Sequence, residues 1–345
     1  MGVTIGVAGA TGALGKEIVQ VLDEAPWRPE RVVPLASRAS SVPYVEYGET
    51  KVGVDDLAEQ AMDELDVLVL AVPPDVAREA GEESIAEGVP VVDLSGVFAA
   101  EDDAPLVLPW VNPEILAELP PEGVVSLPGP TAQLLAAILG PLRRAGVVAD
   151  VDATVLLPAS AWGRAGIEEL SAQVIALFNQ GTPPRKVFHD GFAFDLLPQV
   201  GATDDSGWTV AEQRAVAEVQ ALTGTPGPLR ATIVGVPVFS GISATLHLRT
   251  PQHLDLTLIE RILSDGGATL PKAAGARYLP RPRRVDGKPF VQVGRLRQDP
   301  AGDGIHLWAA LDNVRGAAAA AVATVGALLK VRGGSWSVGA PLVRH

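Results

Sequence analysis

The chain has 345 residues, of which 47% are hydrophobic and 20% charged, and its formal net charge is −14. A chain of this length can form two domains, each with its own core. The acidic balance argues against a nucleic-acid partner, because phosphate binding needs a basic face. The absence of cysteine excludes disulfides, cysteine-ligated metals and any thiol nucleophile.

The N-terminus shows no basic segment followed by an apolar one, so we expect no signal peptide. The longest apolar run, 316–329, is shorter than the roughly 20 residues that span a bilayer. We therefore expect a cytoplasmic protein without membrane contact. We also expect no metal, because no metal-ligand spacing is found among the five histidines, which are His189, His247, His253, His306 and His345.

An apolar, β-branched start at 3–7 leads into three glycines and then into a helical pattern at 18–22. Glycine at these spacings allows positive φ angles and lets a phosphate approach the backbone at a helix N-terminus. This pattern favours binding of a dinucleotide pyrophosphate over an ordinary connection with incidental glycines. The residues predicted to contact the cofactor are Gly9, Thr11, Gly12, Ala13, Leu14 and Gly15.

A second predicted strand, 31–36, ends in Ser37 and Arg38. An NAD site usually has an acidic residue at this distance from the glycines, where it binds the ribose hydroxyls. Arginine and serine suit a 2′-phosphate instead, so we predict NADP as the cofactor. The alternative is a solvated arginine on a polar loop.

Further apolar runs predict strands at 67–71, 89–93 and 124–126, with a helix over 75–87. Such continuous runs are typical of a parallel sheet covered by helices on both faces. A helix follows from about Thr131, which could cap it. The N-terminal part is thus predicted to be a doubly wound α/β domain.

From about residue 150 the pattern changes to that of an α+β domain. Strands are predicted at 151–157, 231–238, 244–248 and 305–309, and helices at 166–178 and 210–222. Asp312 and Asn313 precede a final helix of small residues that ends near 331. Small residues allow close packing, so we expect this helix to return to the first domain.

Several ordered motifs resemble the aspartate-semialdehyde dehydrogenase family, and within it the Usg-type branch. They are the turn 9–15, the segments 35–38, 95–99, 105–113, 133–137, 160–163 and 192–198, and the C-terminal segments 294–299 and 307–317. The resemblance implies a Rossmann domain formed by 1–130 and the helix 313–331. It also implies a glyceraldehyde-3-phosphate-dehydrogenase-like dimerisation domain over 131–312, hence a homodimer, and it leaves open association with an active paralogue.

In that family a cysteine nucleophile, a histidine acid/base, two substrate arginines and a glutamine act on an acyl phosphate or aldehyde with NADPH. Carried over to this sequence, these positions hold other residues, which leaves no catalytic residue to assign. Gly129 and Pro130 stand where the cysteine belongs, and Ile242 stands where the histidine belongs. The remaining positions are Gly235 and Ala99 for the arginines and Leu157 for the glutamine.

Neither isoleucine nor proline can move a proton or attack a carbonyl, so the resemblance predicts a cofactor-binding homologue without the native reaction. Ser126 and Thr131 lie near the lost cysteine, but a hydroxyl without an adjacent base is a poor nucleophile. The alternative is an active NAD(P)-dependent oxidoreductase with a non-thiol mechanism. Asn313 matches the family residue that approaches the nicotinamide; a role as a helix cap is the other interpretation.

Overall fold

The computed structural model describes residues 2–99, 101–118, 122–147, 150–224, 227–250, 255–271, 279–300, 302 and 304–333. The chain divides into two compact units. Unit 1 consists of Met1–Gly129 and Ala317–His345, and unit 2 consists of Pro130–Gly316. His253 and His345 lie outside the described residues.

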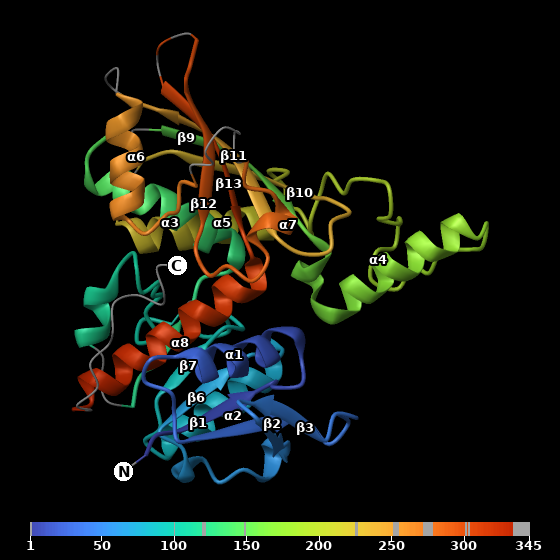
Figure 1. The fold of residues 1–345 in the computed structure, drawn as a ribbon, viewed down its shortest axis with the longest axis vertical. Helices are drawn as coiled ribbons and strands as arrows, with labels where there is room; N and C mark the ends of the chain where they lie inside the picture. Colours follow the sequence, from blue (N-terminus) through green and yellow to red (C-terminus); the bar gives the residue numbers. More distant parts are fainter. Residues whose placement is uncertain are drawn as a thin grey trace. The chain divides into compact units, whose positions relative to one another are not determined.

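Unit 1 is built on a six-stranded, wholly parallel sheet with the order β5-β2-β1-β6-β7-β8 (Figure 1). This is the order of a doubly wound dinucleotide-binding sheet, in which ligands bind where the strand order reverses, here between β1 and β6. The strands are β1 (Thr4–Ala8), β2 (Arg31–Ala36), β5 (Asp55–Asp56), β6 (Val67–Leu70), β7 (Val91–Asp93) and β8 (Val124–Ser126). The doubly wound α/β fold predicted for the N-terminal part is therefore confirmed.

Helices α1 (Ala13–Glu24) and α2 (Pro74–Ala86) follow β1 and β6 as crossover connections. The strand β6 is buried along its whole length, as its continuous apolar run predicts. A hairpin of β3 (Tyr44–Tyr47) and β4 (Thr50–Gly53) lies between β2 and β5 in the sequence. Short 3₁₀ helices complete this unit: η1 (Leu57–Glu59), η2 (Met62–Glu64) and η3 (Pro113–Glu118).

The final helix, α8 (Asn313–Val331), belongs to unit 1 from Ala317 onward. A Cβ atom at Gly326 would lie 2.7 Å from the indole nitrogen of Trp27, so this glycine allows the helix to pack closely against unit 1. Asp312 caps the helix, because its Oδ1 accepts hydrogen bonds from the backbone N–H groups of Val314 and Arg315. The helix is long and apolar enough to cross a membrane, but 67% of its apolar window is buried inside the molecule, as in a core helix.

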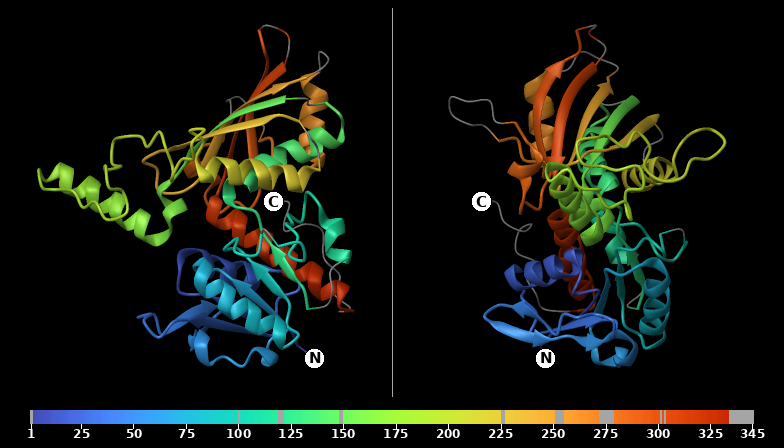
Figure 2. Two further views of the ribbon diagram at one scale, coloured as in Figure 1. Left: turned by 180° about the vertical axis from the view of Figure 1, so that it is seen from behind. Right: turned by 90° about the vertical axis from the view of Figure 1, so that its right-hand side faces the viewer.

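Unit 2 contains a five-stranded mixed sheet with the order β10-β9-β11-β13-β12. Of the described strands of this sheet, β9 and β10 pair in parallel and the other neighbours pair antiparallel. Helices α3 (Pro130–Arg144), α5 (Val210–Thr223) and α6 (Leu256–Asp265) cover one face, as both views in Figure 2 show. The strands are β9 (Asp150–Leu157), β10 (Leu229–Gly235), β11 (Ile242–Arg249), β12 (Gln292–Gln298) and β13 (Gly304–Leu311).

Alternate residues of β9, β10 and β11 are buried, which confirms a sheet with one covered face. The first helix of this unit, α3, begins at Pro130, the position where a missing N–H group does no harm. Thr131 therefore lies inside the helix, and the expectation that it is the cap is wrong. The last short helix, α7 (Pro282–Val285), precedes β12.

After β9, the 3₁₀ helix η4 (Ala159–Trp162) leads into α4 (Gly163–Phe178), which extends away from the sheet (Figures 1 and 2). Two buried side chains of α4 hold the following loop. The carboxylate of Glu169 accepts hydrogen bonds from the N–H groups of residues 186–188 at 2.8–2.9 Å. Gln173 accepts them from the N–H groups of Phe192 and Ala193. We call α4 and the loop 184–197 the α4 arm.

Candidate cofactor and substrate site

The glycine turn after β1 has the backbone geometry of a pyrophosphate loop. Gly9 has φ +83°, and a Cβ atom there would lie 2.3 Å from the carbonyl oxygen of Ala71. A Cβ atom at Gly15 would lie 2.1 Å from the carbonyl oxygen of Gly9. Only glycine fits at these two positions, because an added methyl group would collide with backbone atoms.

Gly12 plays a different part in the same turn. It is exposed, it is the N-cap residue of α1, and a Cβ atom there would lie 3.3 Å from the Gly9 carbonyl oxygen. No side chain among the described residues caps this helix end. The exposed end of α1 thus offers backbone N–H groups and the positive end of the helix dipole to an anion. Thr11 and Leu14 are half-buried beside it, and Ala13 is exposed.

Ser37 and Arg38 are both exposed at the end of β2, next in the sheet to β1. The guanidinium of Arg38 contacts the carboxylates of Asp56, on β5, and Glu59, on η1. Arg38 is thus at the strand end expected for a 2′-phosphate ligand, but in this structure two carboxylates bind it.

At the carboxyl end of β7, Asp93 organises the turn that contains Ala99. Its buried carboxylate accepts hydrogen bonds from the backbone N–H groups of Ser95, Gly96 and Phe98 and, at 2.6 Å, from the Ser95 hydroxyl. The hydroxyl of Ser126, on neighbouring β8, lies 3.5 Å from the same carboxylate. Ser126 is fully buried. Asp93 therefore stabilises a turn, and its oxygens are already engaged as acceptors.

The segment to which the resemblance assigns the family's cysteine joins β8 to α3. Leu127 donates its N–H to the carbonyl oxygen of Asp93 at 2.8 Å, which fixes the start of the segment. Gly129 then ends unit 1 and Pro130 begins α3. Proline at the first helical position contributes neither a side-chain nucleophile nor a backbone donor.

In unit 2 the structure brings together two residues that the resemblance assigns to catalytic positions. Leu157 and Gly235 are register partners at the ends of β9 and β10. Ile242 is fully buried at the start of β11. Beside it, the side-chain oxygen of buried Asn313 accepts hydrogen bonds from the Ser160 hydroxyl at 2.9 Å and from the Gly241 N–H at 3.1 Å. Asn313 therefore connects the strand end to η4, and the helix cap is its neighbour Asp312.

Two family models match this chain over most of its length. Residues 4–119 match the semialdehyde dehydrogenase NAD binding domain, and residues 139–316 match the semialdehyde dehydrogenase dimerisation domain. The chain belongs to the semialdehyde dehydrogenase family. The resemblance inferred from the ordered motifs is thus confirmed, and the glycine turn lies in the NAD-binding domain.

Individual relatives agree with this assignment. The chain is 33% identical to the USG-1 protein homolog of Pseudomonas aeruginosa over 94% of this chain and 97% of the relative. It is 30% identical to aspartate-semialdehyde dehydrogenase 2 of Vibrio cholerae over 94% and 97%, respectively. Among solved structures, a probable aspartate-semialdehyde dehydrogenase from P. aeruginosa matches with a TM-score of 0.89, 33% identity and coverage of 96% and 99%. Aspartate semialdehyde dehydrogenase II of V. cholerae complexed with ASA matches with a TM-score of 0.90, 29% identity and the same coverage.

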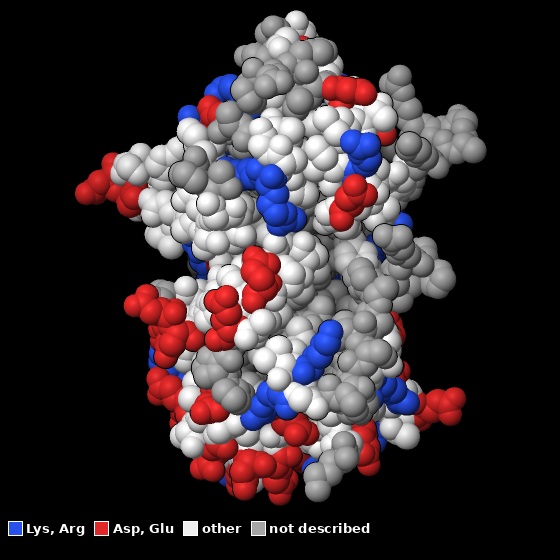
Figure 3. Space-filling model, turned by 90° about the vertical axis from the view of Figure 1, so that its left-hand side faces the viewer, with Lys and Arg blue, Asp and Glu red and all other residues white. Residues whose placement is uncertain are grey.

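The surface charge of this family member agrees with its composition. On the face shown in Figure 3, acidic side chains gather over unit 1 and basic side chains are scattered. The described residues on that face thus form no continuous basic area of the kind that a nucleic-acid backbone requires.

Proposed function

We propose that this protein is a homodimeric, NADP(H)-binding member of the semialdehyde dehydrogenase family that lacks the family's native activity. The observation that carries the proposal is a glycine turn with intact cofactor-binding geometry in a chain without any cysteine.

The cofactor part rests on the turn 9–15 and on the end of β2. Gly9 and Gly15 allow the close backbone approach, and the exposed end of α1 supplies N–H groups for the pyrophosphate. Ser37 and Arg38 would bind the 2′-phosphate, which requires Arg38 to exchange at least one carboxylate partner for it. Asn313 is assigned to the nicotinamide side through the family motif alone. When bound, the nicotinamide would supply a hydride donor or acceptor.

The loss of the native reaction rests on what replaces the reactive groups. Removing the nucleophile of a covalent mechanism can cost on the order of 10⁶ in rate, and losing a general acid/base costs roughly 10²–10⁴. Ser126 is no substitute, because it is fully buried and its nearest carboxylate, Asp93, already accepts four hydrogen bonds in its turn. Ile242, in the acid/base position, carries no proton to transfer.

The decisive experiment incubates the purified protein with aspartate semialdehyde, phosphate and NADP⁺ and follows the absorbance of the reduced cofactor. The V. cholerae aspartate-semialdehyde dehydrogenase 2 serves as the active control. We expect no turnover above background together with saturable NADP binding in calorimetric titration. Turnover at ordinary enzyme rates would favour the alternative, an active oxidoreductase with a non-thiol mechanism. Absence of binding of either NADP or NAD at millimolar concentration would overturn the cofactor part.

The homodimer is supported by the match of 139–316 to a dimerisation domain and by large apolar side chains exposed on the α4 arm. These side chains are Ile175, Leu177, Phe178, Phe194 and Leu196. Exposed apolar groups gathered in this way are typical of protein interfaces.

We further propose a cytoplasmic location and association with an active paralogue. Fractionation and co-purification from the native organism test these two parts.

A further inference from the structure

Two histidines far apart in the sequence face each other on the open face of the unit 2 sheet. His247, on β11, and His306, on β13, are register partners. Their rings stack with centroids 4.3 Å apart and an interplanar angle of 9°. Residues directly opposite one another in an antiparallel pair place their side chains on the same face, so the strand pairing fixes this arrangement.

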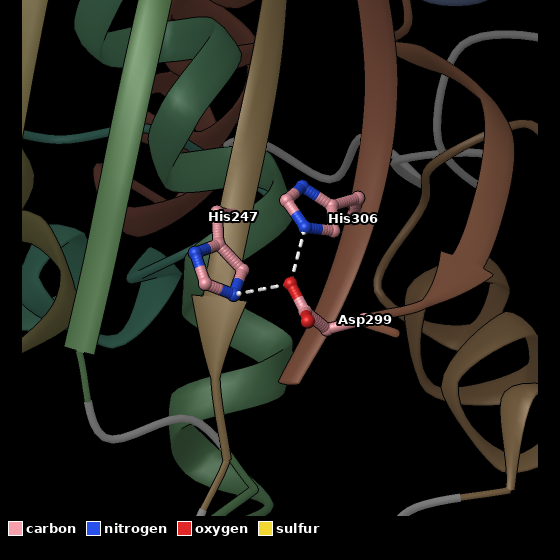
Figure 4. A group of neighbouring side chains, drawn as sticks. All are labelled: His247, Asp299 and His306. Atoms are coloured by element: carbon pink, nitrogen blue, oxygen red, sulfur yellow. Dashed lines mark hydrogen bonds and ion pairs between the residues drawn. The ribbon is translucent and has the colours of Figure 1, made fainter. Parts of the chain in front are cut away.

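Asp299 brings a carboxylate to both rings from the turn between β12 and β13. Its Oδ2 lies 2.6 Å from Nε2 of His306 and 3.3 Å from Nε2 of His247 (Figure 4). The turn is held by a hydrogen bond from the Asp299 N–H to the carbonyl oxygen of Gly304 at 2.9 Å. Ring nitrogens from β11 and β13 thus both contact one carboxylate oxygen of the β12–β13 turn.

The burial of the Nε2 atom of His247 without a hydrogen bond points to a ligand. This atom is buried, and no group among the residues that the structure describes meets hydrogen-bond geometry with it, not even Oδ2 of Asp299 at 3.3 Å. The backbone of Gly304 covers it, because a Cβ atom at that position would lie only 3.1 Å away. A buried ring nitrogen without a hydrogen bond is costly, and a bound cation would satisfy it.

We propose that His247, His306 and Asp299 form a divalent metal site that takes Zn²⁺. One ligand atom from each residue lies within 4.8 Å of the other two. Two imidazole nitrogens and a carboxylate oxygen are zinc ligands, and bonds of about 2.0–2.1 Å in a tetrahedral site place ligand atoms roughly 3.3 Å apart. Asp299 and His306, whose ligand atoms are 2.6 Å apart, must move apart to reach that spacing. At least one of the two stacked rings must also turn so that both nitrogen lone pairs point at the metal, and water would occupy the fourth position.

The charged residues beside this group have other partners. Asp152, the register partner of His247 on β9, forms ion pairs with Arg230 and Arg249 at 3.0–3.1 Å. Arg297, the register partner of His306 on β12, donates from Nη1 to the carbonyl oxygen of Arg295 at 3.0 Å. These flanking charged groups thus have partners of their own outside the His–Asp–His cluster. Bound zinc would join β11, β13 and the β12–β13 turn.

The test uses tag-free, full-length protein stripped with a chelator and titrated with Zn²⁺ by calorimetry. We expect one zinc ion per chain with micromolar affinity or better, and a melting temperature that rises with zinc and falls back with chelator. His306→Gln and Asp299→Asn should each weaken binding by more than the roughly 10–100-fold that loss of an outer-shell partner costs. His189→Gln is the matched control, because His189 is exposed and lies outside the cluster.

Circular dichroism shows whether each variant is folded, and the visible spectrum of bound Co²⁺ reports tetrahedral nitrogen and oxygen ligands in the wild type directly. Absence of saturable zinc binding by the wild-type protein would overturn the site. Unchanged binding in both folded cluster variants would also overturn it, because the metal would then be held elsewhere. Neither readout depends on NADP or on turnover, so the site and the proposed function succeed or fail separately.

Discussion

The side-chain oxygen of Asn313 accepts a hydrogen bond from the hydroxyl of Ser160 at 2.9 Å, and both residues are buried. The same oxygen accepts the N–H of Gly241. Removing it leaves two buried donors unsatisfied, so Asn313→Ala should lower the free energy of unfolding by about 1–3 kcal/mol. In urea denaturation, the double variant with Ser160→Ala should lose less than the sum of the two single losses. Strict additivity would show that the two groups are not coupled.

Two glycines of the turn should have different roles, Gly9 in stability and Gly12 in cofactor binding. Gly9→Ala should cost more than about 2 kcal/mol of stability, because it combines a positive φ with a collision at the Ala71 carbonyl oxygen. Gly12→Ala should cost at most about 1 kcal/mol, since Gly12 is exposed and its φ is −76°. It should nevertheless weaken NADP binding strongly, because the added methyl group lies where the pyrophosphate approaches.

A matched control for these variants is Gly53→Ala, because a Cβ atom at Gly53 would meet nothing within 4 Å. Thermal melting and calorimetric NADP titration of the three variants give the comparison. Equal cofactor affinity in Gly12→Ala and the wild type would remove the pyrophosphate assignment.

Arg38 tests the choice between NADP and NAD. Charge-assisted hydrogen bonds contribute about 1.5–3 kcal/mol, so Arg38→Ala should weaken NADP binding roughly 10- to 100-fold and leave NAD binding nearly unchanged. Glu59→Gln should instead strengthen NADP binding modestly, because it removes a carboxylate that now binds the guanidinium. Fluorescence titration with the two reduced cofactors measures both effects. An equal loss for NADP and NAD in Arg38→Ala would show that Arg38 does not contact the 2′-phosphate.

Glu169 makes the stability of the α4 arm depend on pH. Burial disfavours its charged form, but the hydrogen bonds from the N–H groups of Phe188, Val187 and Lys186 lower its pKa below the ordinary value of 4.5. A pKa lowered by folding stabilises the native state above the unfolded-state pKa, and this stability is lost as pH falls through the folded-state pKa. Glu169→Gln should therefore cost about 1–3 kcal/mol near neutrality, and the difference from wild type should shrink below about pH 4.5.

Glu168→Gln is the control for that experiment, since Glu168 is exposed and its ion pair with Arg164 lies at the surface. Chemical denaturation over a pH series measures both variants. A constant difference between Glu169→Gln and wild type down to strongly acidic pH would contradict the role of the ionised carboxylate.

Phe178 tests the proposed homodimer. Its side chain is 76% exposed. Among the described residues, its one aromatic contact is an edge-on contact with Phe194, with ring centroids 5.9 Å apart. Phe178→Ser should therefore weaken self-association while changing monomer stability by no more than about 0.5 kcal/mol. Sedimentation velocity over a concentration series measures the shift. Val76→Ser, a substitution of an exposed apolar residue on α2, should leave association unchanged.

Much of the fold could be predicted from short apolar runs and glycines. The β1 and β6 strands are buried on both faces, so their continuous apolar character identified them directly. The hairpin of β3 and β4 and the helix α6 were not predicted. The hairpin is exposed on most of its residues, so its sequence carries little apolar periodicity.

The candidate site was predictable only in part. The turn 9–15 is a local structure, in which the glycine positions and the helix that follows decide the backbone shape. The contacts of Arg38 with Asp56 and Glu59, and of Asn313 with Ser160, join segments far apart in the sequence. A local sequence pattern does not indicate such pairs.

The sequence by itself determined the family of this protein, the glycine turn and the absence of a thiol, because each depends only on short contiguous segments or on composition. Only the tertiary structure decided which polar groups meet. His247 and His306 have no metal-ligand spacing, yet the antiparallel pairing of β11 with β13 places them opposite one another, and the turn between β12 and β13 adds Asp299. That register is fixed by the buried alternate residues Leu246, Leu248, Ile305 and Leu307, since a slip of one residue would expose all of them.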